Sequence, residues 1–163
     1  MFKFLGFFGV LAVAMATAAA MVPARAAAVN PVAVLSPADA LASIKAGNHD
    51  CPHCDLRGAD LTNTCVKSGN VVGAKFDDAK LVLMCMSYAN FTGASFRGAD
   101  MAGANLAHAN VDGADFTGAK LAITSLKGTD LRHALGLTQA QLNAACGDAE
   151  TKVPAGMTVH TCS

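Results

Sequence analysis

The chain has 163 residues and twelve basic and twelve acidic side chains, so its formal net charge is zero. This length fits one small domain and leaves no room for a second. The sequence has no tryptophan and one tyrosine, and its balanced charge does not favour nucleic acid or an anionic membrane as a partner.

Residues 1–26 have the three parts of a secretory signal peptide. Lys3 supplies a positive start, residues 4–20 are almost wholly apolar, and Ala24-Arg25-Ala26 offers an A-x-A cleavage site. An uncleaved membrane anchor is the alternative, but the apolar run is marginal in length and rich in alanine. The sequence therefore predicts export, to the periplasm of a Gram-negative bacterium or out of the cell, with no membrane span after cleavage. Cleavage would leave ten basic and twelve acidic side chains, a formal net charge of −2.

Residues 27–53 are predicted to form an N-terminal cap with one short helix. Ser36, Pro37 and Asp39 fit the N-cap, the first helical position and a first-turn carboxylate. Gly47 is expected to end this helix.

The motif Cys51-Pro52-His53-Cys54 is identical to that of periplasmic disulfide oxidants of the thioredoxin superfamily. In those proteins an exposed thiolate at a helix N-terminus is the nucleophile, so the resemblance implies Cys51 as nucleophile and Cys54 as resolving thiol. A redox CxxC lies near a βαβ pattern, whereas here a repeat begins at once, so a structural disulfide is favoured. A zinc site built from His49, Cys51, His53 and Cys54 is a third interpretation, although these four lack the usual separated pairs.

Residues 54–133 repeat every five residues. Each repeat has a large apolar residue at its centre and a small residue two positions earlier, alanine in ten of the sixteen cases. The period matches neither a helix nor a strand, and it indicates one structural unit stacked on copies of itself. The sixteen central residues are Leu56, Leu61, Val66, Val71, Phe76, Leu81, Met86, Phe91, Phe96, Met101, Leu106, Val111, Phe116, Leu121, Leu126 and Leu131.

The register A(D/N)LxG, as in Ala99-Asp100-Met101-Ala102-Gly103, resembles the pentapeptide-repeat family. The resemblance implies an all-β solenoid, a right-handed quadrilateral β-helix with four pentapeptides per coil and about four coils here. It also implies that the central residue and the small residue before it point inward. Because both ends of such a stack expose apolar edge and unpaired backbone, short α-helical caps are expected at both ends.

Stacking the sequence at twenty residues per coil places like residues in columns. Phe76, Phe96 and Phe116 share one inner column. An outer column alternates in charge, as close parallel stacking favours, and reads Asp60, Lys80, Asp100 and Lys120.

Residues 134–163 are predicted to form a C-terminal cap helix and tail. The helix is expected to begin near Thr138, with Gln141 in its first turn, and to end at Gly147. The tail from residue 148 is expected to fold back over the last coil.

Six cysteines, an even number in a chain predicted to be exported, suggest disulfides, and fifteen pairings are possible. Cys65 and Cys85 occupy the same position on successive coils, within disulfide range, although two stacked free thiols are the alternative. The remaining pairs would be Cys146 with Cys162 and Cys51 with Cys54.

One outer face is apolar on three successive coils. Exposed apolar patches often mark contact sites, and packing of the tail or the N-terminal helix is an equal alternative. This apolar strip consists of Val82, Leu83, Ala102, Gly103, Ala122 and Ile123.

The sequence has no phosphate-binding glycine loop and no hydrolase motif, so no catalytic, cofactor or metal site is predicted. The favoured function is a non-enzymatic exported structural or interaction module whose partner is a protein or an envelope component. A periplasmic thiol-disulfide oxidoreductase using the CPHC motif is the alternative. A DNA mimic that inhibits a topoisomerase is less favoured, because the quinolone-resistance pentapeptide proteins are cytoplasmic and strongly acidic.

Overall fold

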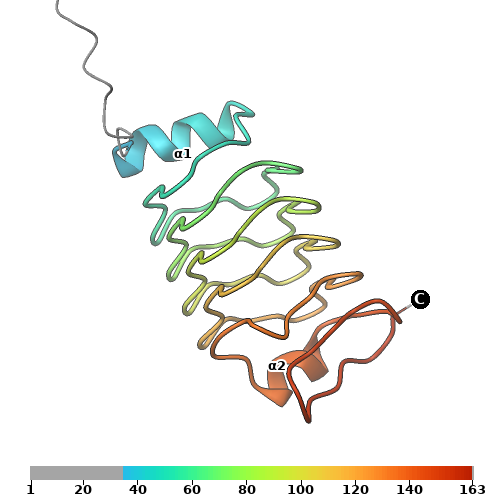
Figure 1. Ribbon diagram of the computed structural model, residues 1–163. Helices are drawn as coiled ribbons and strands as arrows, with labels where there is room; N and C mark the ends of the chain where they lie inside the picture. The colour runs from blue at the N-terminus through green and yellow to red at the C-terminus, as the bar shows by residue number, and fades with distance from the viewer. Residues whose placement is uncertain (1–34, 163) are drawn as a thin grey trace, which may run out of the picture. The chain divides into compact units, whose positions relative to one another are not determined.

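The computed structural model describes residues 35–162, so the predicted signal peptide lies outside the described residues. The described chain begins with helix α1, Pro37–Lys45, continues through a stack of coils and reaches helix α2, Gln139–Ala144, before an extended tail. In Figure 1, α1 lies at one end of the stack and α2 at the other. Within residues 35–162, no helix is both long and apolar enough to cross a membrane.

Helix α1 begins and ends where the sequence predicts. The side chain of Ser36 accepts a hydrogen bond from the backbone N–H of Asp39 at 3.3 Å, and Pro37 needs no partner for an N–H because it has none. Ala40 and Ile44 are buried in the same core as the first coil, and Gly47 has the left-handed φ of 89° that follows a helix end.

The coils are joined by single parallel bridges between residues twenty positions apart. Asp55 bridges Lys75, Lys75 bridges Ser95, and the series continues in this register to Leu135. Each bridge is supported by backbone hydrogen bonds, such as Leu56 N–H to Lys75 O at 2.8 Å. Twenty residues per coil is four repeats of five, so the predicted quadrilateral solenoid is confirmed. Its ladder begins at Cys51, which donates to Asn70 O at 2.8 Å, one repeat before the predicted boundary.

Each repeat turns a corner of the coil through a hydrogen-bonded turn. In the first full repeat, Ala59 N–H donates to Leu56 O at 3.1 Å, and Gly58 between them has a φ of 65°. The left-handed residue at this position favours glycine. The turn directs the central residue and the next small residue into the core, where Leu56 is 1% exposed.

The core is a column of stacked side chains rather than a broad layer. Phe96 stacks on Phe76 with ring centres 5.2 Å apart and on Phe116 with ring centres 5.1 Å apart. All three rings are fully buried. The column predicted from the twenty-residue register is therefore present.

Helix α2 closes the other end of the stack. Thr138 and Gln141 form a capping box, and the side-chain amide of Gln141 also donates to Phe116 O at 2.7 Å and to Ala119 O at 2.9 Å. One coil earlier, Ala99 O accepts the backbone N–H of Lys120, whereas Ala119 O has the Gln141 amide as its donor. The tail then adds an irregular turn, because Cys146 bridges Ser125 twenty-one positions earlier.

Candidate functional site

The apolar strip occupies the turn positions of one solenoid face. Leu83 N–H donates to Ala102 O and Gly103 N–H donates to Ala122 O, both at 2.9 Å, so the three coils lie in register. Val82 and Ala102 are half-buried, and Ala122 is exposed. The backbone therefore holds the whole strip rigidly.

Two large side chains of the strip face solvent. Leu83 is 56% exposed and Ile123 is 70% exposed. Gly103 lies between them: a Cβ atom at Gly103 would be 2.7 Å from Leu83 Cδ2 and 3.8 Å from Ile123 Cδ1. Among residues 35–162, neither α1 nor the tail covers these two side chains, so the strip is an open apolar surface within the part of the chain that the structure describes.

The backbone at these two residues is in a conformation that side chains disfavour. Leu83 has a φ of 56° and Ile123 a φ of 51°. A β-branched residue with positive φ is a genuine outlier, and the left-handed conformation costs an L-residue about 1–2 kcal/mol. Residues at the same turn position in other repeats, such as Asn63 with a φ of 57°, are also left-handed, so the fold imposes this conformation.

A charged column flanks the strip. Lys80 and Lys120 both bridge Asp100 through the backbone, and Lys120 Nζ lies 3.7 Å from Asp100 Oδ2. Opposite charges in neighbouring coils therefore follow one another along the stack, as the column predicted from the sequence requires. This exposed ion pair contributes little to stability, but the charged column gives the apolar strip a polar border.

Tyr88 extends the exposed surface onto the adjacent face. Its side chain is 58% exposed, its ring stacks on His108 with centres 4.9 Å apart, and Lys67 Nζ lies 6.0 Å from the Tyr88 ring centre. The sequence reasoning missed Tyr88 as part of a contact surface. The available signal was the single tyrosine of the chain at an outward turn position five residues after Leu83.

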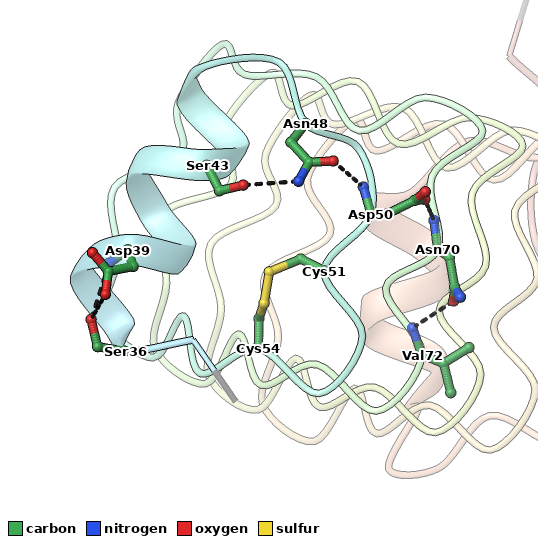
Figure 2. Close-up of a disulfide and its surroundings, with 9 residues drawn as sticks. All are labelled: Ser36, Asp39, Ser43, Asn48, Asp50, Cys51, Cys54, Asn70 and Val72. Carbon is green, nitrogen blue, oxygen red and sulfur yellow. Dashed lines mark hydrogen bonds between the residues drawn. A yellow bond between two sulfur atoms is a disulfide. The ribbon is translucent and has the colours of Figure 1, made fainter. Parts of the chain in front are cut away.

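The CPHC motif is buried beneath the N-terminal cap. Cys51 and Cys54 are each 2% exposed, and they share a core cluster with Ala40 and Ile44 of α1. Their Cα atoms are 5.5 Å apart, and Figure 2 shows their sulfurs joined as a disulfide. Neither sulfur is accessible to a protein substrate in this arrangement.

The proposed zinc set is not assembled. In the described part of the chain, the group of possible metal ligands that comes together is Cys146, His160 and Cys162. The set of His49, Cys51, His53 and Cys54 is absent from it because both cysteines point into the core while His53 is exposed.

The other cysteines also lie in pairs. Cys65 and Cys85 bridge each other through the backbone, with Cα atoms 4.5 Å apart. Cys146 and Cys162 have Cα atoms 5.3 Å apart. The structure thus brings together the same three pairs that the sequence suggested.

A family model for pentapeptide repeats matches residues 85–122 and 99–135, with eight copies of the repeat. The chain is a pentapeptide-repeat protein. Its fold is therefore the right-handed quadrilateral β-helix that the resemblance implied. Comparison with curated proteins found no match.

Several solved structures are similar to this pentapeptide-repeat protein. Rfr23 from the cyanobacterium Cyanothece 51142 is 28% identical with a TM-score of 0.49, and the match covers 61% of this chain and 63% of Rfr23. A pentapeptide-repeat protein from Nostoc PCC 7120 is 23% identical with a TM-score of 0.40, over 74% of this chain and 97% of its own. QnrB1, a plasmid-mediated fluoroquinolone resistance protein, is 18% identical with a TM-score of 0.43, over 68% of this chain and 79% of its own.

Proposed function

We propose that this pentapeptide-repeat protein is a non-enzymatic, exported interaction module that binds a protein or another component of the cell envelope through the apolar strip. The observation that carries the proposal is the pair Leu83 and Ile123, which are 56% and 70% exposed and lie on left-handed backbone. Leucine and isoleucine are both unfavourable at positions that are exposed to solvent and have a positive φ. A bound partner would remove the exposure by burying the two side chains.

The strip fits a rigid, flat contact. The coil ladder already orders the backbone of the strip, and Leu83 and Ile123 are its two large exposed side chains. Binding therefore has few groups to immobilise, and the conformational entropy lost on binding is small. Leu83 and Ile123 are the natural anchors of such a contact, Gly103 is the recess between them, and the Asp100 and Lys120 pair forms a polar border. Tyr88 enlarges the contact area when the partner also covers the adjacent face of the solenoid.

The two other functions have less support. An oxidoreductase needs an accessible thiolate, whereas Cys51 and Cys54 are each 2% exposed. A DNA mimic needs a strongly acidic surface, whereas this chain has a balanced formal charge over its full length.

The test is capture of binding partners from a periplasmic extract by the mature protein. Leu83→Asp is expected to abolish capture while leaving the far-ultraviolet spectrum and thermal midpoint nearly unchanged. His53→Asp is the matched control, because His53 is exposed with a φ of 59° and lies one and a half coils from Leu83, on the opposite face, and it is expected to retain capture. Equal capture by wild type and Leu83→Asp would reject the strip as the binding face.

Export has its own test. Cleavage after the A-x-A site predicts that the mature chain begins at Ala27, or at Val29 if cleavage falls later, and intact-mass measurement of the recovered protein checks this. Non-reducing peptide mapping of the same material is expected to recover Cys65 joined to Cys85, and alkylation of both thiols in fresh material would contradict that bond.

A further inference from the structure

Three metal-binding side chains converge at the C-terminal end of the solenoid. The ligand atoms of Cys146, His160 and Cys162 all lie within 4.8 Å of one another, and His160 Nε2 is 3.2 Å from Cys162 Sγ. The two sulfurs are bonded to each other in this structure. The proposed binding function uses none of these residues.

The backbone holds these residues in place independently of the sulfur–sulfur bond. Cys146 N–H donates to Thr124 O at 2.8 Å, and Leu126 N–H donates to Cys146 O at 2.7 Å, so Cys146 is part of the coil ladder. Gly147 N–H donates to His160 O at 2.8 Å, which fixes the tail strand beside it. Opening the disulfide therefore leaves the two arms next to each other.

A second contact anchors the tail to α2. The side-chain amide of Gln139 donates to Thr158 O at 2.8 Å, and Thr158 N–H donates to Gln139 Oε1 at 3.0 Å. This reciprocal pair holds the segment just before His160. The histidine thus stays close to both sulfurs when they are thiols.

The site is reachable from solvent and distinct from the other cysteine pairs. His160 is exposed, and Cys146 and Cys162 are half-buried. Among the described residues, neither Cys51 and Cys54 nor Cys65 and Cys85 has a third possible ligand gathered beside it. Three protein ligands leave one position of a tetrahedral ion open to water or an exogenous ligand.

We propose that Cys146, His160 and Cys162 form a redox-gated site for a thiophilic cation, Zn²⁺ or Cu⁺. Two thiolates and one imidazole are the ligand types that these ions prefer. A dithiol reductant supplies two electrons, converts the cystine to two thiols and itself closes to a disulfide. Binding of the ion then releases the two thiol protons. A disulfide-bonded oxidant that accepts two electrons and becomes a dithiol rejoins the two sulfurs, and the ion is expelled.

The experiment titrates the full mature chain with Co²⁺, a coloured substitute for Zn²⁺, after anaerobic reduction and removal of the reductant. Reduced wild type is expected to bind one equivalent and to show thiolate-to-cobalt charge-transfer absorption, whereas oxidised protein shows none. His160→Gln is expected to weaken binding by more than about tenfold, the scale already reached when only an outer-shell partner is lost. His53→Gln, at another exposed histidine beside a cysteine, is the matched control and is expected to bind as wild type does.

Cys162→Ser is expected to remove the charge-transfer band, and His160→Gln keeps the proposal testable if Cys162→Ser does not fold. Undiminished Co²⁺ affinity in His160→Gln would overturn the proposal. Absence of binding in reduced wild type that keeps its native circular dichroism would overturn it as well, as would a band that survives Cys162→Ser and disappears in Cys65→Ser/Cys85→Ser. Because the apolar strip is untouched, these outcomes are independent of partner capture.

Discussion

Replacing Ile123 by glycine is expected to stabilise the isolated protein while removing its binding anchor. The left-handed conformation at a φ of 51° costs an L-residue about 1–2 kcal/mol, and glycine adopts it freely. Glycine also loses more conformational entropy on folding than isoleucine does, and this offsets about 0.5–1 kcal/mol of the gain. Because Ile123 is 70% exposed, little apolar burial is lost, and the expected gain in the free energy of unfolding is about 0–1.5 kcal/mol.

The assay is urea denaturation of the oxidised mature protein, with partner capture measured on the same samples. Gly103→Ala is the matched reverse change, because Gly103 has a φ of 67° and its added Cβ would lie 2.7 Å from Leu83 Cδ2. It is expected to destabilise by at least about 1 kcal/mol. A loss of stability in Ile123→Gly of more than 1 kcal/mol would refute the reasoning, because Ile123 would then contribute packing to the fold rather than an anchor for a partner.

Three further predictions concern the core, the C-terminal cap and pH. Phe96→Ala is expected to cost about 3–5 kcal/mol and Thr92→Ala less than about 0.5 kcal/mol, and equal denaturation midpoints would contradict the inward and outward assignment. Gln141→Leu is expected to cost about 1–3 kcal/mol because it leaves Ala119 O without a donor and removes one of the two donors to Phe116 O, and an unchanged midpoint would show that water replaces the amide. The side-chain hydrogen bond from Arg57 lowers the pKa of Asp55 to about 2, so its stabilisation is present above the unfolded pKa near 4 and is lost as pH falls toward 2. Asp55→Asn should therefore flatten the acid limb of thermal stability in that window, and parallel curves for variant and wild type would argue against a role for the pair.

The solenoid could be predicted because one local rule is repeated sixteen times. A large residue every fifth position defines the repeat, and the resemblance to the pentapeptide-repeat family supplies the inward direction and the four repeats per coil that place Phe76, Phe96 and Phe116 in one column. The cap helices were predicted for a similar reason, since Ser36 and Thr138 satisfy helix N-termini through contacts three residues away.

The ends of the stack could not be predicted in the same way. The tail has no repeat, so nothing in the sequence specifies that Cys146 bridges Ser125 with an offset of twenty-one rather than twenty. The contact of Gln141 with Phe116 O spans twenty-five positions and depends on where α2 packs. The apolar strip was visible in the sequence, but the exposure of Ile123 depends on which way the tail runs.

The CPHC motif illustrates how the same four residues acquire different chemistry in different folds. In the repeat, a central residue and the small residue three positions later both point inward across one turn, as Leu56 and Ala59 do, joined by a backbone hydrogen bond of 3.1 Å. Cys51 and Cys54 occupy this pair of positions one repeat earlier, and Cys54 N–H donates to Cys51 O at 3.3 Å. The CxxC spacing here is therefore the spacing of the solenoid corner.

A catalytic cysteine needs solvent access and a stabilised thiolate. Cys51 lacks solvent access because α1 covers it. We therefore expect the mature protein not to catalyse disulfide formation in a reduced test substrate, and we expect Cys51→Ser to lower the thermal midpoint modestly without removing any such activity. A periplasmic CPHC oxidoreductase assayed in parallel is the positive control. Substrate oxidation that disappears in Cys51→Ser would mean that α1 leaves the first coil in solution, and the N-terminal cap would then be a gate over a redox centre instead of a fixed end of the core.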